Sequence, residues 1–248
     1  GSEEEIKRLL EELRKSSEEL RRITKELDDL SKELRVGGSG SGSEMLVEHN
    51  KLISEHNRII VENNRIIVEI LEAIARVGGS GSGSVEVERI LDELRKSSEE
   101  LDRVTKELKK LTEELDVGGS GSGSVEALVR HNVLITRHND IIVKNNDIIN
   151  KILKLIGEAV GGSENLYFQG SGSEFERWLR QLEESTKELR KFTEELRRFS
   201  EELKVGGSGS GSVEALVRHN EAIVEHNKAI VKNNDIIVKI LELVTERI

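Results

Sequence analysis

The chain of 248 residues has no cysteine, no proline and few aromatic residues: one Trp, one Tyr and four Phe. Without cysteine it forms no disulfide bond. It also lacks a run of about 18 apolar residues, so we expect no membrane-spanning helix. The net charge of −10 argues against nucleic acid as a partner. What remains is 35% charged and rich in Leu, Ile, Glu, Lys and Arg, which is typical of long helices packed side by side.

Glycine and serine are concentrated in five linkers. GGSGSGS occurs at 37–43, 78–84, 118–124 and 206–212, and the related GGSENLYFQGSGS spans 161–173. Such runs are flexible linkers, and they divide the chain into six segments. A serine such as Ser43 precedes each segment, where helix N-caps are preferred, and a glycine such as Gly161 follows the first five, where helices commonly end. The sequence therefore predicts six helices.

The linkers also predict how the helices pair. A linker of seven residues readily joins antiparallel neighbours, so consecutive helices should form hairpins. The expected divisions are hairpin A at 1–77 (helices 2–36 and 44–77), hairpin B at 85–160 (helices 85–117 and 125–160), a cleavable linker at 161–173, and hairpin C at 174–248 (helices 174–205 and 213–248).

Two kinds of helix alternate along the chain. The first, third and fifth segments carry a narrow apolar stripe at spacings of three and four, exemplified by Ile6, Leu10 and Leu13, and are otherwise charged. Such helices pack on one side only. In the other three segments, five of every seven positions are apolar, His or Asn. The fold class we expect is therefore all-α: a six-helix bundle or coiled coil of three inner and three outer helices, with up-down connectivity and pseudo-threefold symmetry.

The inner segments carry polar pairs where a core should be. HN, HN and NN follow one another at seven-residue steps in each of them, so threefold packing gathers them at three levels. The histidines are His49, His56, His131, His138, His219 and His226. The asparagines are Asn50, Asn57, Asn63, Asn64, Asn132, Asn139, Asn145, Asn146, Asn220, Asn227, Asn233 and Asn234.

Hydroxyl side chains interrupt the outer stripes at the same step of seven. They are Ser17, Thr24, Ser31, Ser98, Thr105, Thr112, Thr186, Thr193 and Ser200. Folding the first hairpin about the middle of its linker brings Ser31 level with His49 and Thr24 level with His56, and the other hairpins agree within one residue. A buried polar group without a partner costs about 1–3 kcal/mol, so these residues should form satisfied hydrogen-bond networks.

Together these features resemble de novo designed two-ring helical bundles with buried hydrogen-bond networks. The outer–inner hairpins, the inner VENN-type motif, the heptad-spaced polar layers and the Gly/Ser linkers carry the resemblance, which covers all six helices. The HN tiers are similar to the pH-responsive branch of that family, in which histidine is built into the network. Members are usually homotrimers of hairpins, whereas this chain joins three unlike hairpins.

The differences between the hairpins are systematic. Larger residues on one helix match smaller ones on its neighbour, as in a volume-conserving exchange. The packing residues that we expect to set specificity are Trp178, Phe192, Phe199, Ala222 and Ala229. Charges change as well, because Asp140 and Asp147 stand where the second segment has Arg58 and Arg65. We expect an asymmetric, heterotrimer-like assembly within one chain. The alternative is variation introduced only to ease gene synthesis or crystallography.

One linker contains a motif of another kind. ENLYFQG at 164–170 resembles the tobacco etch virus protease site, which implies cleavage between Gln169 and Gly170. Cleavage there would separate the last two helices from the first four.

The histidines admit three interpretations. They are neutral core residues that only fix register, a proton switch, or a His₃ zinc site formed by three histidines at one level. Neutral imidazole has one donor and one acceptor, whereas imidazolium has two donors and a charge. Burial should lower the histidine pKa below about 6.5, so a network tuned to the neutral form should lose stability in acid. The Asn and hydroxyl partners favour hydrogen bonding over metal.

Little in the sequence points to catalysis. There is no Gly-rich loop after a strand and no Glu-x-x-His pair, and the carboxylates lie on solvent-facing strips. We therefore expect no catalytic residue, no cofactor and no resident metal. The expected partners are the hairpins themselves, within the chain or as fragments after cleavage, and membrane contact arises only if acid exposes the apolar inner faces. We expect a soluble recombinant protein in the cytoplasm of its expression host.

Overall fold

Each predicted segment forms one long helix. The computed structural model describes residues 2–36, 42–77, 82–117, 122–163, 169–205 and 210–246. The helices are α1 (Ser2–Val36), α2 (Gly42–Val77), α3 (Ser82–Val117), α4 (Ser122–Ser163), α5 (Gln169–Val205) and α6 (Ser210–Thr245). The described ranges contain no strand, so the all-α expectation is confirmed.

Helix bounds differ most from expectation around 161–173. The fourth helix does not stop at Gly161 but continues to Ser163, and α5 begins at Gln169, within the predicted linker. Once a helix is nucleated, each added residue gains a backbone hydrogen bond, and a glycine costs only about 1 kcal/mol relative to alanine. A few Gly and Ser residues therefore do not end these helices. Residues 164–168 lie outside the described ranges.

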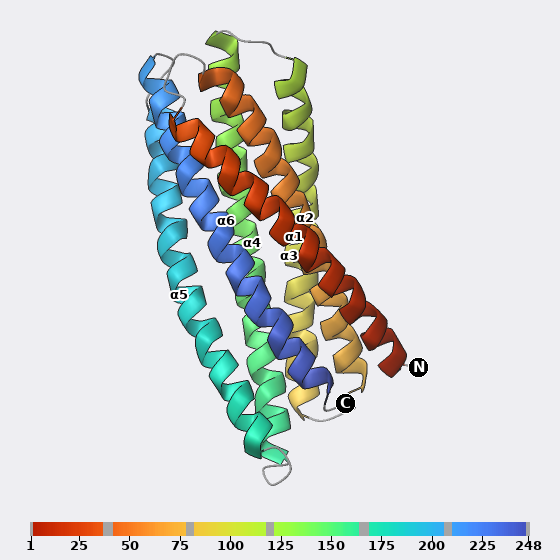
Figure 1. The fold of residues 1–248 in the computed structure, drawn as a ribbon. Helices are drawn as coiled ribbons and strands as arrows, with labels where there is room; N and C mark the ends of the chain where they lie inside the picture. Colours follow the sequence, from red (N-terminus) through yellow and green to blue (C-terminus); the bar gives the residue numbers. More distant parts are fainter. Residues whose placement is uncertain are drawn as a thin grey trace.

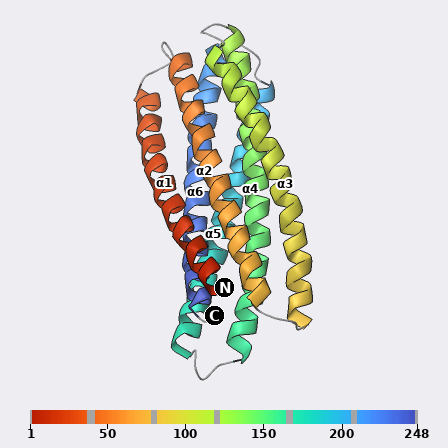
Figure 2. The ribbon, with the colours of Figure 1, turned by 90° about the vertical axis from the view of Figure 1, so that its right-hand side faces the viewer.

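The helices form two rings. They run alternately up and down the bundle (Figures 1 and 2), and α2, α4 and α6 contact one another to form the inner ring. Each outer helix lies in a groove between two inner helices: α1 between α2 and α6, α3 between α2 and α4, and α5 between α4 and α6. Within the described ranges the outer helices do not contact one another. The predicted architecture of three inner and three outer helices is therefore confirmed.

Apolar clusters fill the bundle along its length. One contains Leu46 and Leu128, the next contains Ile53 and Ile60, and the last contains Ile67. These inner-helix side chains are fully buried, because the seven-residue step returns them to the inside of the bundle at each repeat. The HN and NN pairs fall between them in sequence, so polar levels interrupt the apolar core.

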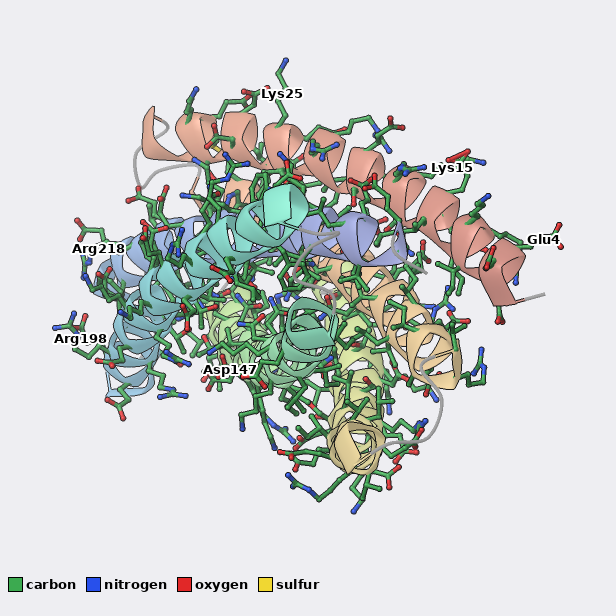
Figure 3. The ribbon with its side chains drawn as sticks, turned by 90° about the horizontal axis from the view of Figure 1, so that it is seen from below. Glu4, Lys15, Lys25, Asp147, Arg198 and Arg218 are labelled. Atoms are coloured by element: carbon green, nitrogen blue, oxygen red, sulfur yellow. The ribbon has the colours of Figure 1, made fainter. Side chains whose placement is uncertain are left out.

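Charged side chains cover the outside. Glu4, Lys15 and Lys25 of α1, together with Arg198 and Arg218, point away from the bundle in Figure 3. The ion pairs of the described residues involve partly or largely exposed side chains, such as Arg14 with Glu242. Exposed ion pairs contribute about 0–1 kcal/mol each, so stability comes mainly from the interior.

Candidate functional site: three buried polar tiers

The six histidines are inaccessible to solvent, and all twelve predicted network asparagines are at most 2% exposed. They lie in three groups that we call tiers. Tier one contains His49, Asn50, His131, Asn132, His219 and Asn220; tier two contains His56, Asn57, His138, Asn139, His226 and Asn227; tier three contains Asn63, Asn64, Asn145, Asn146, Asn233 and Asn234. The three inner helices therefore bring together the residues that the sequence aligned.

Asparagines at the bundle axis form closed cycles in the first two tiers. In tier one Asn50 donates to Asn132, Asn132 donates to Asn220, and Asn220 donates back to Asn50. The distances from Nδ2 to Oδ1 are 2.6, 2.6 and 2.7 Å. The corresponding contacts of tier two are all 2.8 Å. Each cycle runs in one direction around the three inner helices, so it ties each hairpin to both others.

The second N–H of each cycle amide is donated to a histidine. In tier one the contacts run from Asn50 to His131 (2.9 Å), from Asn132 to His219 (2.9 Å) and from Asn220 to His49 (2.8 Å). All three contacts of tier two are 2.9 Å. The histidine atom is Nδ1 in every case. Because an amide N–H only donates, Nδ1 must accept, which places the proton of the neutral ring on Nε2.

Hydroxyl groups on the outer helices accept the hydrogen bond from Nε2–H at five of the six histidines. Nε2 meets a hydroxyl at 2.7–2.8 Å in five pairs, which are His49 with Ser31, His56 with Thr24, His131 with Thr112, His138 with Thr105, and His226 with Thr193. Each of the four threonines donates its own proton to the backbone carbonyl four residues earlier. Its oxygen is therefore free to accept from Nε2–H. A directed chain of bonds runs from the axis to the outer helix, and the sequence register predicted all five pairs.

The sixth histidine departs from this pattern. Nε2 of His219 lies 3.2 Å from Oγ1 of Thr136, and the backbone carbonyl of Leu196 also accepts a hydrogen bond from this ring, so the predicted Ser200 is not its partner. Ser54 similarly lies 3.1 Å from Nε2 of His131. Sequence reasoning missed Ser54 and Thr136, both on inner helices. Ser54 and Thr136 occupy equivalent positions, and α6 has Val224 there. A polar residue at a position that is otherwise apolar was the sequence signal that could have identified them.

Tier three repeats the arrangement with asparagine in place of histidine. Asn63 donates to Ser16 (3.2 Å) and Ser17 (3.4 Å) on α1, and Asn233 donates to Ser185 (3.2 Å) and Thr186 (3.3 Å) on α5. At the axis, Asn146 donates to Asn233 and Asn234, and Asn234 donates to Asn63 and Asn64, at 3.0–3.3 Å.

The cycle of tier three is open between α2 and α4. Nδ2 of Asn64, both amide atoms of Asn145 and Oδ1 of Asn146 are buried without a partner, as is Oγ of the adjacent outer-helix Ser97. Ser98, the predicted partner of Asn145, therefore makes no bond to it. We call each contact between two inner helices within a tier a seam. The other two seams of this tier are closed by direct hydrogen bonds, so the open seam is specific to hairpins A and B.

Of the residues predicted to set packing specificity, Ala229 is buried and the other four are partly buried. Phe192, Ala222 and Ala229 belong to the same apolar cluster. Trp178 packs against another cluster, and the ammonium of Lys239 lies 4.7 Å from its ring centre. Phe199 is half-buried on α5. The predicted cleavage residues Gln169 and Gly170 form the first turn of α5.

Burial changes the protonation chemistry of the tiers. Desolvation lowers the pKa of His49, His56, His131, His138 and His219 to about 4, and a hydrogen bond to the Leu196 carbonyl partly opposes this effect at His219. It lowers the pKa of His226 to about 3, with a smaller contribution from the charge of Arg197. The predicted lowering of the histidine pKa is therefore confirmed, and all six rings are neutral at pH 7.

Neither a group of metal-binding side chains nor a membrane-spanning helix occurs in the described part of the chain. Among the described residues, no three His, Cys, Asp or Glu side chains are grouped in a way that could hold a metal ion. None of the helices in these ranges has a stretch long and apolar enough to cross a membrane. No protein-family model and no curated protein sequence matches the chain. The protein is thus a six-helix bundle with buried His, Asn, Ser and Thr networks.

The open seam predicts unequal effects at equivalent positions of tier three. Asn145→Leu removes two unpartnered amide atoms, so it should change the free energy of unfolding little or raise it. Asn63→Leu and Asn233→Leu each remove bonds to a hydroxyl and should lower it by about 1–3 kcal/mol. Guanidinium unfolding of the three variants at pH 7.5 measures the difference. Equal losses in all three would show that the seam is closed in solution.

Proposed function

We propose that this protein is a designed, non-enzymatic bundle whose function is the specific assembly of three unlike hairpins, and that acid weakens this assembly. The observation that carries the proposal is the pair of closed asparagine cycles, each of which holds three neutral histidines. The resemblance to designed hairpin bundles supports a designed origin, and the cleavage motif at 164–170 supports use of the last hairpin as a separable fragment.

The cycles make assembly specific because they are complete only in one register. A hairpin that slips along the axis moves its His and Asn side chains against apolar layers such as those around Ile53 and Ile60. Each buried donor or acceptor that loses its partner then costs about 1–3 kcal/mol. Several are lost at once, because every cycle asparagine bonds to both other inner helices. Misaligned arrangements are therefore strongly disfavoured.

Protonation of a histidine weakens the same hydrogen-bond network. A second proton on histidine must bind Nδ1, which faces the N–H of an asparagine. Rotating that one amide by half a turn would point its oxygen at the new proton. The same oxygen would then face the amide oxygen of the next asparagine in the cycle. Reversal of all three amides restores the cycle, but it turns an oxygen toward Nδ1 of the two rings that gained no proton. One proton therefore disturbs all three hairpins in its tier.

Charge adds to this effect. Each of the first two tiers gathers three histidines, and no carboxylate contacts them within the tier. The positive charge of Arg197 further disfavours protonation of His226. Additional protons in one tier also repel one another in a medium of low dielectric constant.

The pKa shifts fix the direction of the pH dependence. Because the folded-state pKa is lowered, the unfolded chain binds protons first as the pH falls below about 6.5. Stability is therefore full above pH 6.5 and is lost between about 6.5 and the folded-state pKa of about 4. At pH 5 the loss is about 2 kcal/mol per histidine, or roughly 12 kcal/mol for six, comparable with the 5–15 kcal/mol that stabilises a whole domain.

A second candidate is a purely structural bundle in which the same residues only fix register. The low histidine pKa values support this candidate, because rings that stay neutral down to about pH 4 leave the network intact in the folded state. The bundle then stays folded if core packing contributes more stability than proton binding to the unfolded chain removes. The extensive apolar clusters favour such an excess. The two candidates differ in whether the assembly comes apart above pH 4.5.

Cleavage between Gln169 and Gly170 separates the candidates. We expect the two fragments to stay associated at pH 7.5 and to dissociate between pH 6 and 4.5, because dissociation exposes the histidines of all three hairpins to protons. The matched control replaces all six histidines with asparagine, the residue that tier three already carries at these positions. Size-exclusion chromatography with light scattering at each pH reports association. Dissociation of both proteins at the same pH would refute the switch.

Zinc provides a separate test of the histidines. Both ring nitrogens of His49, His56 and His138 are engaged by Asn and hydroxyl partners, so a metal would have to break bonds in whichever histidine tier it entered. We expect zinc at pH 7.5 to leave the unfolding midpoint unchanged relative to a chelator-treated sample. A rise in the midpoint that the chelator reverses would instead support a His₃ site.

A further inference from the structure

Gly157 lies in an inner helix at a point where a side chain would fit only if a neighbouring aromatic ring moved. A Cβ atom added to it would overlap Cε1 of Phe175 and lie 2.8 Å from its Cζ. Phe175 is on α5 and is only 9% exposed, so its ring is held against the backbone of α4. This contact crosses the boundary between hairpins B and C.

The other two boundaries show how this contact differs. Counted from the tier-one histidines, Gly157 of α4 corresponds to Ala75 of α2 and Thr245 of α6. Counted from Thr193, Thr105 and Thr24, Phe175 of α5 corresponds to Val87 of α3 and Ile6 of α1. The same level of the bundle therefore pairs Phe with Gly, Val with Ala, and Ile with Thr. The largest outer residue meets the smallest inner one.

We propose that Phe175 and Gly157 form a size-matched pair that fixes the cyclic order of the three hairpins. This inference rests on the proposed function of specific assembly. In the reversed order α5 would pack beside α2, and Phe175 would meet the Cβ of Ala75. In the same arrangement Ile6 would face Gly157 and leave a cavity. The reversed order thus combines overpacking at one boundary with a void at another.

Charges along the same boundary point to the same order. Arg190 of α5 lies 3.4 Å from Asp147, and Arg197 lies 3.4 Å from Asp140, both on α4. At the corresponding positions α2 carries arginines, Arg65 and Arg58. Packing α5 beside α2 would therefore place Arg against Arg at two levels, in addition to the clash at Phe175. Like charges across such a boundary select partners by excluding wrong ones.

The sign of one substitution tests the pair. Alanine is a better helix former than glycine, so Gly157→Ala in an ordinary helix raises stability. Here we expect it to lower the midpoint of guanidinium unfolding at pH 7.5, because its methyl group meets the Phe175 ring. In a Phe175→Val background, which copies the Val87–Ala75 pair, the same change should raise the midpoint. Ala75→Gly is the matched control and should lower it in both backgrounds. A rise for Gly157→Ala in both backgrounds would overturn the proposal.

Cross-linking tests the cyclic order itself. The chain has no cysteine, so a thiol cross-linker that joins Lys154→Cys to Glu183→Cys reports α5 beside α4, where the parent side chains form an ion pair of 3.1 Å. Glu72→Cys with Glu183→Cys reports α5 beside α2, because Glu72 corresponds to Lys154. We expect only the first pair to be joined by a short bismaleimide, and the second should be joined when Gly157→Ala and Ala75→Gly are combined. Equal joining of both pairs in the parent chain would refute a fixed order. These readouts are taken at pH 7.5 and do not depend on the acid response.

Discussion

Three asparagine side chains that bond head to tail around the bundle axis impose the constraint on which the rest of this structure depends. Because each amide has two N–H groups and the cycle uses one, the other is free to hold Nδ1 of a histidine on the next helix. That contact settles the tautomer of the ring, which makes Nε2 a donor to a hydroxyl such as that of Thr112 on an outer helix. The asparagine cycles thus align the three inner helices, and the bonds from histidine to hydroxyl extend this alignment to the outer helices.

The cycles alone do not distinguish one hairpin from another, since they are nearly threefold symmetric. The distinction comes from residues outside the tiers, in particular Phe175 against Gly157 and the arginines of α5 against Asp140 and Asp147. Polar tiers therefore set the level at which the helices meet, and side-chain volume and charge set which helices meet. The open seam at Asn64 and Asn145 shows that the asymmetry reaches the third tier as well.

Much of this arrangement could be predicted from the sequence, because residues seven positions apart stay on nearly the same face of a helix. The two rings follow from the different apolar faces, and the pair Ser31–His49 follows from counting across a linker. The rotation of the inner helices could not be predicted, since His and Asn flank the buried Ile53, Ile60 and Ile67 on both sides. The replacement of Ser200 by Thr136 at His219, and the role of Gly157, depend on contacts between hairpins that no local pattern encodes.

Desolvation keeps the six buried histidines neutral, and amides that form closed cycles hold them in one tautomer. Nitrogen-15 NMR of the imidazole rings in the intact chain tests this central claim most directly, because protonated and unprotonated ring nitrogens resonate far apart. At pH 7 we predict that all six rings carry the proton on Nε2 alone, and that they stay neutral as the pH falls through 6.5 for as long as the bundle remains folded. Rings that exchange between tautomers, or that titrate near pH 6.5 in the folded protein, would contradict the account.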